Sequence, residues 1–274
     1  MLLVVTLAAT YGGWLYAQQE ALIYGQRATS SAETAAATAV GAELLRFPVV
    51  DLQQAAWLLP PGPDLSSPQL WIMCIGQGGV GAQWLREPGY LVPSLHRATG
   101  AAFLLIDYPG SGEAVGTPSP TGILQLTRAA QAAALAQLGW KRATTRIGVV
   151  GMSLGTGIAA QHAAAEHCER LVLISPYTTL LEVVQQRQPW PIWHLLRHRY
   201  DTRVALDALA TVPQAQVLMY HGVDDQAIPI QMARELAQTH PALVRLVEVP
   251  GAGHGDVLDA VLPQAIAAMS AMLR

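Results

Sequence analysis

The segment Gly151-Met152-Ser153-Leu154-Gly155 carries the clearest chemical signal in the sequence. It follows the apolar run Arg146–Gly151, which is typical of a buried strand, and opens an Ala-rich stretch expected to be a helix. A serine on such a tight strand-to-helix turn needs small neighbours, because its backbone is strained and the helix packs close. The helix N-terminus would also favour developing negative charge. We therefore expect Ser153 to be a nucleophile; the alternative is a glycine-rich turn that only happens to contain serine.

A serine hydroxyl is inert without a base, and His254 is the best candidate. It stands in Gly251-Ala252-Gly253-His254-Gly255, directly after the last predicted strand, where glycines leave room for the imidazole to reach inward. The carboxyl ends of parallel strands are where a doubly wound sheet collects its site residues. The acid should follow the preceding strand, and both Asp224 and Asp225 do so. Either aspartate would orient the imidazole and stabilise its charged form.

Acyl transfer at Ser153 would also need two backbone N–H groups aimed at the substrate oxygen. One is expected from Leu154, the residue after the nucleophile. The other is expected from the glycine-rich segment Ile75–Gly81, with Gln77 as the first candidate and Gly78 as the second. This segment lacks the Gly-Lys-Ser/Thr ending of a phosphate loop and the glycine spacing of a dinucleotide site, so no organic cofactor is expected.

The other histidines and the cysteines are expected to be structural. His221 would fasten the acid loop to the end of its strand, and His96 would end a helix, where the helix dipole favours it. Cys74 and Cys168 fit neither a metal-ligand spacing nor a disulfide framework, so we expect buried free thiols and no metal. Solvent exposure is expected for His162, His167, His194, His198 and His240.

From residue 46 onward, short apolar runs alternate with Ala- and Leu-rich helical stretches. This alternation predicts one α/β domain, a doubly wound and mostly parallel sheet of about eight strands with helices on both faces. The runs expected to be strands are Phe47–Val50, Ala56–Leu59, Leu70–Ile75, Ala102–Asp107, Arg146–Gly151, Leu171–Ser175, Gln216–His221 and Val244–Val249. Helices are expected over Thr121–Leu138, Gly155–Glu169, Gln231–Gln238 and Val257–Leu273.

Composition excludes several classes of protein. Of the 274 residues, 51% are hydrophobic and 13% are charged, so the chain has ample apolar surface to bury and is not disordered. The formal net charge is −3 and no basic run occurs, so a nucleic-acid partner has no electrostatic support.

Residues 1–24 form an apolar segment with three possible roles. Leu2–Ala17 is uncharged, but as a helix it would reach only about 24 Å against a bilayer core of ~30 Å. Continuing through Tyr24 would close this gap at the cost of passing Glu20. We expect an N-terminal membrane anchor; a cleaved signal for export to the periplasm or medium, or a helix packed on its own domain, are the alternatives. Residues 25–45 are expected to be a linker and 46–274 the folded domain.

With these residues in place, the chain resembles the α/β-hydrolases, and among them the membrane-anchored or exported serine hydrolases with a minimal lid. The resemblance runs from about Gln19 to the C-terminus. Residues 221–229 match the H-G-x-x-D-x-x-x-P pattern of the acid loop, which implies that Asp225 rather than Asp224 is the triad acid. The further markers are Leu22-Ile23-Tyr24, Ile75-Gly76-Gln77-Gly78-Gly79, Asp107-Tyr108-Pro109-Gly110-Ser111-Gly112, Gly116-Thr117-Pro118-Ser119 and Ser175-Pro176-Tyr177-Thr178-Thr179-Leu180.

Two positions depart from the pattern of this family. Its members usually begin the oxyanion turn with His-Gly, whereas this chain has Ile75, so a supporting side-chain hydrogen bond is absent. They also tend to have Asp-Gly before the second strand, where this chain has Asp51-Leu52-Gln53-Gln54. The short lid is expected at about residues 181–206, where Trp190 and Trp193 would line an acyl pocket or pack the lid onto the core.

The resemblance implies a serine hydrolase that cleaves carboxylic esters or thioesters. Ser153 would attack the acyl carbonyl, His254 would take its proton, and Asp225 would orient His254. The N–H groups of Leu154 and Gln77 would hold the oxyanion, and the substrate would be a small or lipid-like acyl compound. A peptidase or amidase on the same triad is one alternative, and a catalytically silent binding protein of this fold is another.

Overall fold

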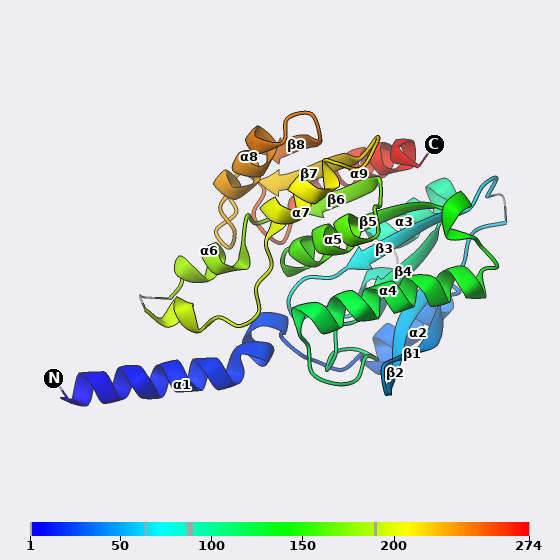
Figure 1. Cartoon of the computed structure of the whole chain (residues 1–274). Helices are drawn as coiled ribbons and strands as arrows, with labels where there is room; N and C mark the ends of the chain where they lie inside the picture. The colour runs from blue at the N-terminus through cyan, green and yellow to red at the C-terminus, as the bar shows by residue number, and fades with distance from the viewer. Residues whose placement is uncertain (1, 64, 87–89, 189–190, 274) are drawn as a thin grey trace.

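One eight-stranded sheet forms the centre of the computed structural model (Figure 1), which describes residues 2–63, 65–86, 90–188 and 191–273. The strand order is β1-β2-β4-β3-β5-β6-β7-β8. β1 and β2 pair antiparallel, as do β2 and β4, and the remaining neighbours pair parallel. The strands are β1 Glu43–Val49, β2 Leu52–Leu59, β3 Gln69–Cys74, β4 Ala102–Ile106, β5 Arg146–Met152, β6 Arg170–Ile174, β7 Gln216–Gly222 and β8 Val244–Val249.

Helices cover both faces of this sheet. In Figure 1, α4 and α5 lie in front of the strands, and α3 and α9 lie behind them. The helices are α1 Leu2–Tyr24, α2 Ser31–Ala39, α3 Leu91–Thr99, α4 Pro120–Gln137, α5 Leu154–Ala165, α6 Leu180–Gln185, α7 Thr202–Leu209, α8 Ile230–Thr239 and α9 Val257–Met272, with 3-10 turns η1 Gly81–Leu85, η2 Arg142–Thr144 and η3 Ile192–Leu195. The predicted α/β architecture is therefore confirmed.

Buried strands explain why the sheet could be predicted. β4 is buried along its whole length, and β3 and β6 are buried except at their first residue. A strand covered on both faces needs an unbroken apolar run, which is the pattern in the sequence. The strand pairs β3·β5, β5·β6, β6·β7 and β7·β8 all run parallel, so their carboxyl ends meet at one edge.

Helix α5 ends earlier than the expected stretch Gly155–Glu169. His167 takes a positive φ of 51°, and the Cys168 N–H donates back to the Ala163 carbonyl at 2.8 Å. A residue in the left-handed region followed by such a bond is a common helix stop. The helix therefore ends at Ala165 although helix-forming residues continue.

The segment expected to be a linker, residues 25–45, instead contains helix α2 and the start of β1. Ser30 is the N-cap of α2: its hydroxyl accepts the Glu33 N–H, and the Glu33 carboxylate accepts the Ser30 N–H. This capping box satisfies otherwise unpaired donors and starts the helix. The Ala-, Ser- and Thr-rich sequence of this segment is compatible with a short, capped helix.

Helix α1 projects from the body of the molecule and contacts the segment around η3 (Figure 1). Its C-terminal part is attached by Gln19, whose amide donates to the Leu195 carbonyl and accepts the Arg197 N–H, both at 2.8 Å. Within the part of the chain that the structure describes, no helix combines the length and the apolar character needed to span a membrane.

Candidate active site

Ser153 occupies the sharp turn between β5 and α5, with φ 52° and ψ −122°. Such a backbone conformation is rare for a residue with a side chain and marks a strained position. The glycines on either side allow the close packing that this turn requires. A Cβ on Gly155 would lie 2.2 Å from the Cys74 carbonyl oxygen, and one on Gly151 would lie 2.5 Å from that of Gly155. The tight strand-to-helix turn expected at Ser153 is thus present.

Hydrogen bonds hold the strained serine in place. The Ser153 N–H donates to the Ile174 carbonyl at the end of β6, at 2.9 Å. Its own carbonyl accepts both the N–H and the hydroxyl of Thr156, at 2.9 and 2.7 Å. Backbone and helix together therefore fix the direction of the Ser153 side chain.

Ser153, His254 and Asp225 form one hydrogen-bonded chain. The Ser153 Oγ lies 2.8 Å from His254 Nε2, and His254 Nδ1 lies 2.7 Å from Asp225 Oδ2. A carboxylate can only accept, so the ring proton is on Nδ1 and Nε2 is free to accept the serine proton. The three residues come from the ends of β5, β7 and β8, which the parallel sheet brings together.

Asp225 is held as a buried carboxylate. Its Oδ1 accepts the N–H groups of Ala227 and Ile228, each at 2.8 Å, and only 6% of the residue is exposed. Burial by itself raises its pKa, but hydrogen bonds from His221, His254 and Ile228 lower the pKa well below its usual value. The neighbouring Asp224 is exposed and lies outside this chain of hydrogen bonds.

His221 fastens the acid loop. Its Nε2 lies 2.8 Å from the Ile228 carbonyl and 3.4 Å from Asp225 Oδ2, and the side chain is fully buried. This is the structural role expected from the sequence.

Three histidines that were expected to be exposed are buried, so that prediction was wrong for them. His162 bonds Gln131 Oε1, His198 bonds the Tyr24 hydroxyl, and His240 bonds Asp207 Oδ1. Each imidazole has a polar partner, which lowers the cost of burying it. The partners come from distant parts of the chain, and local sequence carries no signal for them.

The glycine-rich turn after β3 adjoins the nucleophile. A Cβ on Gly76 would lie 3.4 Å from the Ser153 Cβ. The Gly78 N–H donates to the Tyr24 carbonyl at 2.8 Å, whereas the Gln77 N–H makes no backbone hydrogen bond within the described residues. Of the two candidates in this turn, only Gln77 therefore has a backbone N–H that could donate to a substrate oxygen. The Leu154 N–H belongs to the first turn of α5, where N–H groups lack partners within the helix.

Comparison with known proteins finds relatives in sequence but no family model. No family model matches the sequence. "Uncharacterized protein Rv2307c" of Mycobacterium tuberculosis is 31% identical over 244 residues, which cover 89% of this chain and 83% of that protein. Human "Alpha/beta hydrolase domain-containing protein 17C" is 27% identical over 160 residues, 55% of this chain and 43% of that protein.

Solved structures share the fold. An α/β hydrolase from Vibrio vulnificus has a TM-score of 0.68 at 14% identity, covering 97% of this chain and 93% of its own. The Pyrococcus furiosus esterase PF2001 has a TM-score of 0.64 at 14% identity, covering 86% and 92%. The chain therefore has the α/β-hydrolase fold.

The structure has a cavity of about 310 Å³ beside Ser153 and His254, with Leu154 and Gln77 also in its wall. Most of the other lining side chains are apolar and come from α1, α6 and the acid loop. They include Leu22, Ile23, Leu180, Val183, Val184 and Ile228, with Arg187 as a charged exception.

The sequence did not assign α1 a place in the candidate site. Leu22 and Ile23 line the cavity, whereas the sequence marked them only as the end of an apolar stretch and as part of the family resemblance. Trp193 does not line it and stacks on His194 with ring centroids 3.8 Å apart, while Trp190 lies outside the described residues. Over the described part of the chain, no group of three or more His, Cys, Asp or Glu side chains is arranged to hold a metal ion.

Proposed function

We propose that this α/β-hydrolase cleaves carboxylic ester or thioester bonds through an acyl-enzyme on Ser153. The observation that carries the proposal is the continuous chain from the Ser153 Oγ through His254 to the buried Asp225, with distances of 2.8 and 2.7 Å. A hydroxyl becomes a useful nucleophile when an oriented base can take its proton.

In the proposed acylation, the Ser153 Oγ attacks the acyl carbon while its proton passes to His254 Nε2. The carbonyl oxygen becomes an oxyanion held by the N–H groups of Leu154 and Gln77. The imidazolium then gives its proton to the leaving alkoxide or thiolate, and the carbon–oxygen or carbon–sulfur bond breaks. Water repeats the same steps on the acyl-enzyme with His254 as base, and releases the carboxylic acid and free Ser153.

The cavity supports an apolar acyl group as substrate. Its wall from α1 and α6 offers Leu22, Ile23, Val183 and Val184, and contact with these side chains would remove acyl methylenes from water. The name of the Pyrococcus furiosus esterase, a structure of the same fold, is consistent with ester hydrolysis. A small or lipid-like acyl ester or thioester is therefore the proposed substrate class.

The test is labelling with a fluorophosphonate probe together with hydrolysis of p-nitrophenyl butyrate and an acyl thioester. Wild type should label and hydrolyse both, and Ser153→Ala should lose labelling and at least about a thousandfold in kcat. Ser175→Ala is the matched control. Ser175 likewise follows a strand and has a positive φ of 51°, but its buried hydroxyl has no hydrogen-bond partner within the described residues. The proposal would be overturned if the Ser153→Ala variant still reacted with the probe. It would also be overturned if folded wild-type protein did not react.

A further inference from the structure

Gln77 lies in a four-residue turn, Gly76–Gly79, that is stabilised by contacts with other parts of the chain. Its internal bond runs from the Gly79 N–H to the Gly76 carbonyl at 3.2 Å, and Gly78 has a φ of +70°. A positive φ at the third position is the mark of a type II turn, in which the second N–H takes no part in the turn's own bond. The direction of the Gln77 N–H therefore depends on what fixes the rest of the turn.

The C-terminal end of α1 and Gly25, the residue that follows it, supply that support. The Tyr24 carbonyl accepts the Gly78 N–H at 2.8 Å, and the Leu22 carbonyl accepts the Gln77 side-chain amide. The two backbones lie in contact: a Cβ on Gly25 would lie 2.9 Å from Gly78 Cα. The end of the projecting helix and Gly25 thus pack directly on the turn that carries Gln77.

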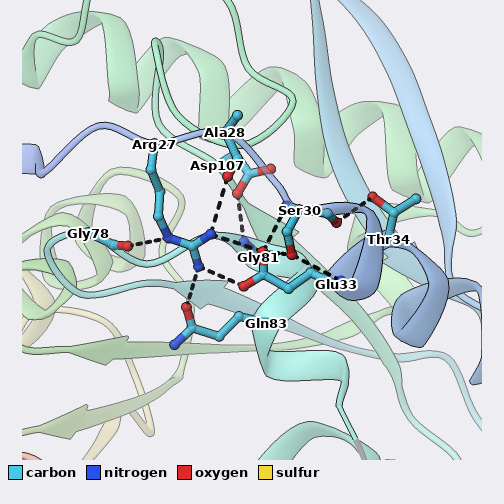
Figure 2. Close-up of polar contacts among 9 residues, drawn as sticks. All are labelled: Arg27, Ala28, Ser30, Glu33, Thr34, Gly78, Gly81, Gln83 and Asp107. Carbon is cyan, nitrogen blue, oxygen red and sulfur yellow. Dashed lines mark hydrogen bonds and ion pairs between the residues drawn. The ribbon is translucent and has the colours of Figure 1, made fainter.

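Arg27 completes this support with all five of its N–H donors (Figure 2). Its Nε donates to the Gly78 carbonyl at 2.8 Å. One terminal nitrogen donates to the Ala28 carbonyl at 3.2 Å and to Glu33 Oε2 at 2.9 Å. The other donates to Glu33 Oε1 and to Gln83 Oε1, both at 2.8 Å. A guanidinium has five such donors in a fixed plane, so none is left over.

These bonds connect three parts of the chain. Glu33 belongs to α2, Gly78 to the turn after β3, and Gln83 to η1. The main chain of Arg27 is itself fixed, because its carbonyl accepts the Gly112 N–H at 2.8 Å. Arg27 therefore forms a rigid link between a fixed backbone and the turn.

The turn lacks the supporting side-chain hydrogen bond that a histidine at the position of Ile75 would supply. Ile75, which precedes it, has no side-chain donor, and its carbonyl is occupied by the Tyr108 hydroxyl at 2.7 Å. An oxyanion hole accelerates a reaction only when its donors are already aimed at the position of the developing charge.

We propose that Arg27 is a positioning residue that holds the turn so that the Gln77 N–H stays aimed at the oxyanion. The inference rests on the proposed function, since it assigns Arg27 a part in stabilising the transition state of that reaction. Arg27 does not touch the substrate and acts through the Gly78 carbonyl.

The experiment compares Arg27→Met and Arg27→Lys with wild type in the full chain. Hydrolysis of p-nitrophenyl butyrate gives kcat and KM, fluorophosphonate titration counts active sites, and an alkyl boronic acid serves as a tetrahedral transition-state analogue. In Arg27→Met, kcat per labelled site should fall roughly 10- to 100-fold. This decrease is no larger than the decrease in kcat that follows removal of an oxyanion donor. KM should change by less than about threefold. Boronate affinity should fall with kcat. Arg27→Lys should have a kcat and a boronate affinity between those of wild type and Arg27→Met, because an ammonium group has three donors and lacks the planar geometry of a guanidinium.

Arg234→Met is the matched control. Arg234 also forms a two-bond ion pair, with Glu248 at 2.8 and 2.6 Å, on the exposed side of α8 and β8. It should leave kcat and boronate affinity unchanged.

The outcomes separate the two proposals. A wild type that neither labels nor hydrolyses the ester overturns the proposed function and this inference with it. A wild type that is active, with Arg27→Met equal to it in kcat per labelled site, overturns the inference alone. Fewer labelled sites with unchanged kcat per site would show a purely structural role and would also overturn it. If Arg27→Met does not fold, Arg27→Lys is judged by the same criteria.

Discussion

At the scale of single residues, the site depends on side chains that are each fixed by backbone groups. Asp225 accepts two backbone N–H groups through one oxygen and leaves the other for His254. Ser153 is held in a positive-φ conformation by bonds to β6 and α5. The side chains of Asp225 and Ser153 are therefore each held in one orientation. Catalysis by pre-organised groups requires such fixed orientations before the substrate binds.

Substitution of the two adjacent aspartates, Asp224 and Asp225, tests which of them orients His254. Asp225→Asn should lower kcat about 10³- to 10⁴-fold, because an amide in place of the carboxylate favours the wrong imidazole tautomer. Asp224→Asn should change kcat by less than about threefold, since this side chain is exposed and outside the triad. Steady-state ester hydrolysis measures both. Equal losses in the two variants would contradict the assignment of the acid.

At the scale of elements, α2 shows how a short helix stabilises a distant turn. Glu33 caps the helix through Ser30 and binds Arg27 through both carboxylate oxygens. The helix has nine residues and would be marginal in isolation. Packing on η1, the burial of Ala37 and the ion pair with Arg27 together hold it in place.

The charge of Glu33 predicts a pH dependence of stability. The hydrogen bond from Arg27 lowers the pKa of Glu33 to about 2, against the opposing effect of burial. Its unfolded-state pKa is about 4.3, so this contribution is complete above that value and is lost as pH falls toward 2. The difference in free energy of unfolding between wild type and Glu33→Gln should therefore be largest above about pH 5 and shrink toward pH 3. Urea unfolding at several pH values measures it; a difference independent of pH would contradict the ion-pair assignment.

At the scale of the whole molecule, the sheet gathers into one site groups that are far apart in the sequence. Ser153, Asp225 and His254, the proposed triad, follow β5, β7 and β8, and the turn proposed to hold the oxyanion follows β3. Helices α1 and α6 supply the apolar wall of the cavity. The hydrophobic core runs continuously through the sheet and its covering helices. The domain should therefore unfold as one unit.

The two free thiols test this cooperativity. Cys74 in β3 and Cys168 after α5 are both buried, and burial raises the pKa of the Cys168 thiol to about 12 and that of Cys74 further. Neither should react with Ellman's reagent at pH 8 in the native protein. In a urea titration both should become reactive at the same midpoint as the loss of circular dichroism. One thiol reacting earlier would reveal a separately unfolding part.

Sequence patterns determined the sheet, the elbow at Ser153 and the histidine loop, because each depends on local chemistry. A buried parallel strand needs an unbroken apolar run, and a strained elbow needs glycines beside its serine. Asp225 could be preferred over Asp224 only through a family pattern, and the fold places it against His254.

Contacts between distant segments were decided by tertiary structure alone. Nothing near Arg27 in the sequence points to the carbonyl of Gly78 or the amide of Gln83. The same holds for Leu22 in the cavity and for the buried His162 and His198. The physical reason is that a hydrogen bond or an apolar contact constrains both partners in space but leaves their spacing in the chain free.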